Sequence, residues 1–133
     1  MNLKNMQPIL TPNNFSIGVD IETIERFEKY ASSKPLTEKL GIFTPKEIDY
    51  CFKSKMPAKH LAARFCAKEA IHKAFCSLDT EFTPKFNETE IVNNYRGVPE
   101  VSFLDERFKS FECKLSLSHC SDKAIAYVFL HRN

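Results

Sequence analysis

A stripe of alanines in one long helical segment constrains the fold more than any other feature of the sequence. A helix is expected from about Pro57 to Cys76, because proline suits a first helical position and the residue before a proline resists the helical conformation. At about 100° per residue, four alanines of this segment fall on one narrow stripe: Ala63, Ala67, Ala70 and Ala74. Such small side chains let the helix press closely against a sheet or another helix.

Near the N-terminus a strand is expected to run directly into a helix. Apolar residues alternate with Ser16, Gly18 and Asp20 over residues 15–21, which is the period-two pattern of a strand with one apolar face. Gly18 and Asp20 therefore share the opposite face. Helical spacing begins near Ile24, so Asp20 lies close to the junction of the strand and the helix.

The remaining elements complete a mixed fold. A helix is expected to begin at Pro45, since Thr44 and Glu47 form a capping box around its start. The second half of the chain has the patterns of two hairpins and a short helix, with strands at residues 88–93, 98–103, 114–118 and 124–130 and the helix at 105–111. This order predicts an α+β fold in which helices pack on one small antiparallel sheet.

Length and composition favour a single soluble domain. The chain has 133 residues with 19 Lys+Arg and 17 Asp+Glu, for a net charge of +2, so a surface devoted entirely to nucleic acid is not expected. No apolar run approaches the roughly 20 residues that a membrane span needs. We expect residues 1–14 to be a loose extension or an extra edge strand, and residues 15–133 to form the domain. Five cysteines without a C-x-x-C pair indicate reduced thiols and a cytoplasmic protein.

The near-neutral total hides one basic segment. Residues 53–73 contain six basic residues and one acidic residue, which gives a local charge of about +5. This segment is either a binding surface for an anionic ligand or an ordinary solvated helix face, and the sequence leaves both interpretations open.

Two carboxylates from different elements are candidates for a metal site. Asp20 ends the first strand beside the uncrowded Gly18, and Glu69 lies in the middle of the alanine-rich helix. Together they suit Mg²⁺, which takes one or two carboxylates, keeps several waters and completes its coordination with substrate phosphates. In the alternative, Asp20 caps the following helix while Glu69 and Lys73 form an exposed pair one turn apart.

Two motifs identify a family that the chain resembles. Residues 18–26 have the sequence G-V-D-I-E-T-I-E-R, and residues 63–75 have the sequence A-R-F-C-A-K-E-A-I-H-K-A-F. Weaker matches follow in order, with F-T-x-x-E at residues 43–47, G-V-P at 97–99 and L-S-L-S-H at 115–119. These motifs resemble those of the holo-acyl-carrier-protein synthases, the small 4'-phosphopantetheinyl transferases, over nearly the whole chain.

The resemblance implies an activity and a fold. Such an enzyme moves the phosphopantetheine arm of coenzyme A to a serine of an acyl carrier protein and releases adenosine 3',5'-bisphosphate, as in fatty acid biosynthesis. By this resemblance Asp20 and Glu69 hold Mg²⁺ on the pyrophosphate of coenzyme A, and Lys73 neutralises charge on the transferring phosphate. The implied fold is that of the 4'-phosphopantetheinyl transferases, and the implied assembly is a homotrimer with sites between neighbours.

The resemblance also implies binding residues. Arg64 and His119 match positions near the adenosine and its 3'-phosphate. Lys68 matches a lysine of the family motif and is expected to serve either as a phosphate contact or as structural support. Lys55 is also expected among the cofactor-binding residues, because it belongs to the basic segment rather than to a family motif. Arg26 falls where the family docks its acidic carrier protein.

Two departures from the family pattern leave the metal carboxylates intact. Ala63 stands where a glycine is usual, and Val98 stands where the turn usually has a lysine or arginine. We expect these changes to affect coenzyme A affinity or carrier preference. Two alternatives remain open: a coenzyme A or carrier-binding module that has lost catalysis, and a basic RNA-binding module, which ranks last because stacking aromatics do not interleave with the basic segment.

Overall fold

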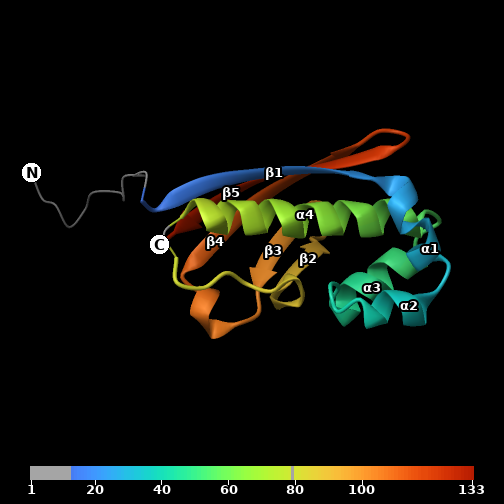
Figure 1. The fold of residues 1–133 in the computed structure, drawn as a ribbon, viewed down its shortest axis with the longest axis horizontal. Helices are drawn as coiled ribbons and strands as arrows, with labels where there is room; N and C mark the ends of the chain where they lie inside the picture. The colour runs from blue at the N-terminus through green and yellow to red at the C-terminus, as the bar shows by residue number, and fades with distance from the viewer. Residues whose placement is uncertain (1–12, 79) are drawn as a thin grey trace, which may run out of the picture.

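One long helix lies along a three-stranded antiparallel sheet and forms the centre of the molecule (Figure 1). The computed structural model describes residues 13–78 and 80–133. The sheet has the strand order β1–β5–β4, with β1 at Phe15–Thr23, β5 at Lys123–Arg132 and β4 at Phe111–His119. The helix, α4, spans Pro57–Ser77 and contacts β1 and β5 most extensively. The first and last strands of the chain are therefore neighbours.

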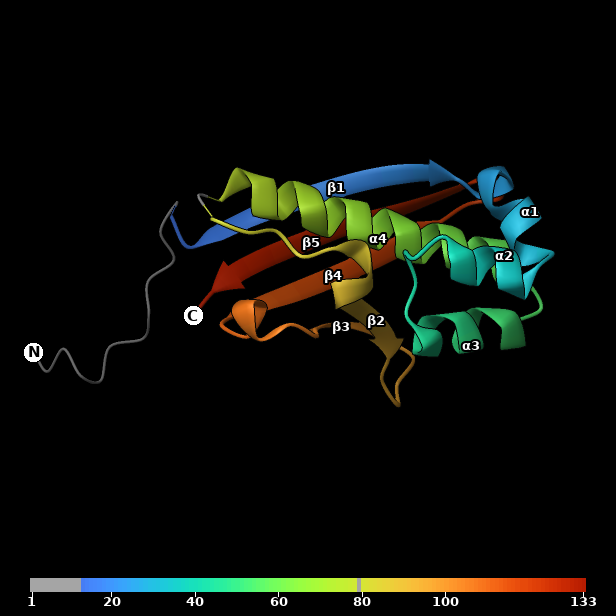
Figure 2. The same cartoon turned by 60° about the horizontal axis from the view of Figure 1, so that its bottom comes forward.

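A second sheet and several short helices surround this centre. The strands β2 (Thr89–Asn93) and β3 (Pro99–Phe103) form a separate hairpin sheet, so the expectation of one sheet is wrong. Four helical segments gather at one end of α4, as Figures 1 and 2 show: η2 (Ile24–Phe27), α1 (Glu28–Ala31), α2 (Lys34–Lys39) and α3 (Pro45–Lys53). Two 3-10 turns, η3 (Phe86–Glu88) and η4 (Glu106–Phe108), complete the fold.

The alanine stripe does bring α4 close to β1. Ala67, Ala70 and Ala74 are fully buried against the sheet. At Gly18 a methyl group would overlap the carbonyl oxygen of Ala70 and would lie 2.9 Å from its carbonyl carbon. Ser16, on the same face of β1, donates a hydrogen bond of 2.6 Å to the Ala74 carbonyl. The helix α4 and the strand β1 thus approach this closely because both carry small residues at the contact.

The small and polar face of β1 is the one that packs inward. Its apolar residues Ile17, Val19 and Ile21 point away from α4 and remain 54, 50 and 58% exposed. Ile125 and Tyr127 of the paired strand β5 are exposed beside them, in register with Ile21 and Val19. An apolar sheet face is therefore uncovered in the isolated chain.

The local expectations for the helices hold. Thr44 and Glu47 make the predicted capping box at the start of α3, with the Thr44 amide donating to Glu47 Oε1 at 2.8 Å.

All five cysteines are free thiols, and burial raises the pKa of three of them to about 12: Cys51, Cys66 and Cys113. Among the described helices, none combines the length and the apolar character needed to cross a bilayer.

The N-terminal extension predicted for residues 1–14 lies outside the described residues, apart from its last two.

Candidate active site

The predicted carboxylates lie where β1 crosses the middle of α4. Asp20 is two residues beyond Gly18 on the face that meets the helix. Its Oδ1 accepts a 3.1 Å hydrogen bond from Lys73 Nζ, which also donates to the Val19 carbonyl. The structure thus contradicts the alternative pairing, because Lys73 pairs with Asp20 rather than with Glu69, and because no side chain caps η2.

The second carboxylate belongs to the same region. Glu69 lies one helical turn before Lys73 on α4, is half-buried, and makes no hydrogen bond or ion pair with any described residue. Asp20 lies close enough to this part of α4 for its charge to add to the effect of burial in raising the pKa of Cys66. Asp20 and Glu69 therefore both lie near Lys73, on the two elements that meet there.

The donor set at this position fits a hard divalent cation. Within the described residues, Asp20 Oδ2 is buried and lacks a hydrogen-bond partner, which is costly unless another group satisfies it. No three or more His, Cys, Asp or Glu side chains are placed to hold a metal ion together, there or elsewhere in the described residues. Two carboxylates are nevertheless the protein contribution that Mg²⁺ commonly takes when water and phosphate supply its other ligands.

A pocket of about 290 Å³ lies closer to the N-terminal end of α4 than Glu69 does. Two of the predicted binding residues, Arg64 and His119, line it. Arg64 is only 2% exposed, and its guanidinium lies 4.2 Å from the centre of the Tyr50 ring. Among the described residues, Nε and Nη2 of Arg64 find no hydrogen-bond acceptor. A buried cation with unused donors at a pocket wall is an arrangement that suits an anion.

Further residues of this pocket were not predicted from the sequence. Tyr50 accepts a 2.8 Å hydrogen bond from the Asn93 side chain, so α3 and β2 meet at the pocket wall. Burial lowers the pKa of His60, and the nearby positive charges of Arg64, Lys59 and His119 lower it further. The pocket is therefore electropositive. The sequence carried no signal for Tyr50 or Asn93, because only the packing of α3 against β2 brings them together.

A larger cavity, of about 700 Å³, lies between β3 and β4 and contains none of the predicted site residues. We assign the functional site to the smaller pocket, because that is where a buried charge has unsatisfied donors.

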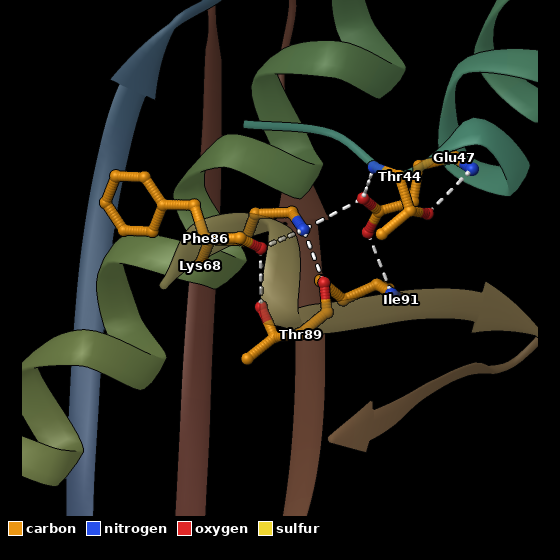
Figure 3. Close-up of polar contacts among 6 residues, drawn as sticks. All are labelled: Thr44, Glu47, Lys68, Phe86, Thr89 and Ile91. Carbon is orange, nitrogen blue, oxygen red and sulfur yellow. Dashed lines mark hydrogen bonds and ion pairs between the residues drawn. The ribbon is translucent and has the colours of Figure 1, made fainter. Parts of the chain in front are cut away.

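Lys68 is a predicted binding residue that the structure takes out of the site and places in the core. Its side chain is fully buried, and its ammonium group lies 2.8 Å from Glu47 Oε1 while donating to the carbonyl oxygens of Phe86 and Thr89 (Figure 3). All three N–H donors are used within the fold, so none remains for a phosphate. Of the two predicted roles for Lys68, structural support is therefore the correct one.

Two other predicted residues lie apart from the pocket. Lys55 is exposed and lines a different cavity, near the start of α4. Arg26 pairs with Glu22 at 3.0 Å and lies over the Phe65 ring at 5.1 Å, with more than half of its side chain still exposed.

The basic segment of residues 53–73 is not a simple solvated face. Arg64 and Lys68 are buried, and the charges of Lys68 and Lys73 are balanced by Glu47 and Asp20. The local charge available to a ligand is therefore smaller than the sequence count of about +5 indicates, and it is concentrated at Arg64 and its neighbours.

Comparison with known proteins decides the family. The family model of the 4'-phosphopantetheinyl transferase superfamily matches residues 16–128. The chain belongs to this superfamily. It is 38% identical over 126 residues to a holo-[acyl-carrier-protein] synthase of Geobacter sp. (strain M21), covering 89% of this chain and 98% of that one. It is 41% identical over 118 residues to the enzyme of the same name from Protochlamydia amoebophila (strain UWE25), covering 84 and 93% of the two chains.

A solved structure of the superfamily has the same fold. The complex of the Chronobacterium ammoniagenes synthase with coenzyme A superposes with a TM-score of 0.72 at 27% identity, covering 90% of this chain and 98% of that one. The predicted α+β fold with helices on a small antiparallel sheet is thereby confirmed as a transferase fold of this superfamily, apart from the division into two sheets.

Proposed function

We propose that this chain, with residues 15–133 as its single domain, is a Mg²⁺-dependent holo-acyl-carrier-protein synthase of the cytoplasm. It transfers the 4'-phosphopantetheine arm of coenzyme A to a serine hydroxyl of an apo-acyl carrier protein and serves fatty acid biosynthesis. The observation that carries this proposal is the buried Arg64 guanidinium, which has two donors that no described residue satisfies and belongs to the lining of a pocket that His119 shares. Its relatives are synthases of this name, and one of them has been solved with coenzyme A.

The pocket suits the adenosine 3'-phosphate end of coenzyme A. Arg64 offers a planar fork that matches a phosphate, and Lys59 adds positive charge beside His119. A volume of about 290 Å³ is small even for an ordinary drug-sized ligand, so this pocket holds one part of coenzyme A and the rest extends beyond it.

The transfer itself is assigned to the region of Asp20 and Glu69. The serine oxygen bonds to the phosphorus that carries the pantetheine arm, the bridging P–O bond of the pyrophosphate breaks, and adenosine 3',5'-bisphosphate leaves. The serine proton passes to a water molecule. Mg²⁺ held by the two carboxylates would neutralise charge on the phosphate oxygens. Lys73, fixed by Asp20 and by the Val19 carbonyl, presents a second positive charge at the same place.

Carrier recognition and assembly are parts of the same proposal. Arg26 is held in position by Glu22 and Phe65 yet remains exposed, so it can meet an acidic carrier surface and speed encounter at low salt. The uncovered apolar face of β1 and β5 is assigned to contacts in a homotrimer, whose neighbouring subunits would complete the small pocket. A monomer mass by light scattering for an active sample would contradict the trimer.

The decisive experiment measures the intact mass of a carrier protein incubated with the enzyme, coenzyme A and Mg²⁺. We expect the serine to gain about 340 Da, the mass of the phosphopantetheine arm. Asp20→Ala and Glu69→Ala should abolish this gain without loss of the fold, while the exposed control Glu106→Ala should retain it. Unchanged transfer by either site variant would refute the assignment.

The second candidate is a coenzyme A or carrier-binding module without catalysis. It is less favoured because Asp20, Glu69 and Lys73 are all present and two of them are already paired in the structure. Binding of coenzyme A with no mass gain on any carrier would establish it.

A further inference from the structure

A buried cluster of polar groups joins four segments of the chain next to the Arg64 pocket. Glu47 and Lys68 have no exposed side-chain surface, and their charged atoms lie 2.8 Å apart. Lys68, on α4, also donates to the carbonyls of Phe86 in η3 and Thr89 in β2. Glu47, on α3, accepts from the Thr44 amide through Oε1 and from the Ile91 amide of β2 through Oε2. Figure 3 shows these contacts converging between the two helices and the strand.

Stability alone does not explain such a pair. Removing two charges from water is expensive, and apolar side chains of similar size often stabilise a core equally well or better. Hydrogen bonds, in contrast to apolar contacts, fix direction and register. The unusual property of the Glu47–Lys68 pair is that each partner bonds to backbone groups of another element, so the pair fixes how α3, α4 and β2 lie relative to one another.

The same three elements carry the walls of the pocket. Tyr50 lies one turn after Glu47 on α3, Arg64 lies one turn before Lys68 on α4, and Asn93 lies two residues after Ile91, on the same side of β2. These three side chains meet: Asn93 bonds to the Tyr50 hydroxyl at 2.8 Å, and Arg64 lies over the Tyr50 ring. A small rotation of α4 would move the Arg64 guanidinium away from the Tyr50 ring.

We propose that Glu47 and Lys68 are positioning residues for the coenzyme A pocket, which hold Arg64, Tyr50 and Asn93 in the arrangement that binds the nucleotide end. The pair acts through these three residues and touches no substrate. This inference rests on the proposed function, because it takes the ligand of the Arg64 pocket to be the adenosine bisphosphate part of coenzyme A.

The test uses a double variant, because a single substitution would leave one buried charge without its partner and endanger folding. Lys68→Met with Glu47→Gln removes both charges at nearly constant volume. We expect this full-length variant to fold, to bind adenosine 3',5'-bisphosphate roughly tenfold more weakly in calorimetry, and to show a similar rise in KM for coenzyme A with little change in kcat. Lys34→Met, which removes the exposed pair with Asp49 on the other side of α3, should bind as the wild type does.

A stability-matched control separates positioning from general loosening. Phe108→Leu alters a buried ring that packs against Phe75 and Phe103 and does not line the Arg64 pocket, so it should lower the melting temperature without weakening nucleotide binding. Wild-type affinity in the double variant, or an equal loss of affinity in Phe108→Leu, would overturn the inference while leaving the proposed function intact. A wild-type chain that neither binds the nucleotide nor transfers the arm would refute the proposed function and this inference with it.

Hydrogen exchange of the wild-type protein provides a second test of the positioning role. Because coupling between two sites is reciprocal, nucleotide binding should strengthen the polar cluster. Hydrogen exchange of the Ile91 amide, which is bonded to Glu47, should slow on nucleotide binding more than that of Val128 in the central strand. Equal slowing at both amides, or no change at Ile91, would count against the positioning role.

Discussion

Gly18 offers the sharpest test of how β1 and α4 fit together. In Gly18→Ala the new methyl group would overlap the Ala70 carbonyl oxygen and would lie 3.1 Å from the Ala74 amide nitrogen. These are backbone atoms in a helix, so they cannot rotate away, and β1 must move off α4. Overpacking of a close core contact typically costs about 1–3 kcal/mol, and we expect the upper end, about 3 kcal/mol, because both sides of the contact are backbone.

Gly41→Ala is the matched control. Gly41 has a φ of +67°, and no atom lies within 4 Å of the place that a methyl group would occupy, so alanine there meets only the cost of the left-handed backbone, about 1 kcal/mol. For a chain of this size, 1 kcal/mol corresponds to a change in Tm of about 4 °C, which predicts losses of roughly 12 °C for Gly18→Ala and 4 °C for Gly41→Ala. Calorimetric unfolding of both variants at one protein concentration measures this difference. If Gly18→Ala is no less stable than Gly41→Ala, the reasoning about the close approach is refuted.

Three further predictions follow from the charges and thiols of the structure. In the native protein at neutral pH, Ellman's reagent should react rapidly with the exposed thiols of Cys76 and Cys120 and should reach the buried thiols of Cys51 and Cys66 only after unfolding. More than three thiols that react before unfolding would contradict the burial of Cys51 and Cys66. Hydrogen bonds from Arg107 lower the pKa of Asp105 from 3.8 to about 2, so the stability that Asp105 contributes is fully present above pH 3.8 and is lost as the pH falls toward 2. In Arg107→Met the pKa of Asp105 should rise back toward 3.8, which NMR titration of the carboxyl group measures. An unchanged pKa would show that Arg107 does not cause the shift. Arg64→Lys should raise KM for coenzyme A more than KM for dephospho-coenzyme A, since lysine lacks the planar fork, and equal increases would place the 3'-phosphate elsewhere.

The features that sequence analysis predicted correctly are those with local causes. The start of α3 follows from Thr44, Pro45 and Glu47, which act on one another within a single turn. The start of α4 at Pro57 likewise follows from the backbone restrictions of proline. The alanine stripe indicated a close contact, although the sequence did not identify which element would make it with the helix.

Glu47 and Lys68 show where local reasoning fails. Each was assigned from its own motif, Glu47 as a helix cap and Lys68 as part of a basic helix face. Only the tertiary structure places them together, 21 positions apart in the chain and bonded to β2, where the ammonium group has no donor left for a ligand. A buried partner cannot be recognised from charge counts along the chain.

The sequence by itself determined the family, the long helix, the capping box and the carboxylates of the candidate metal site, because residue type and spacing within one element encode these features. Only the tertiary structure decided that β1 pairs with β5, that its apolar face points outward, and that Tyr50 and Asn93 join Arg64 at the pocket. The physical reason is that strand pairing and pocket walls depend on contacts between distant segments. Those contacts form only when the whole core packs.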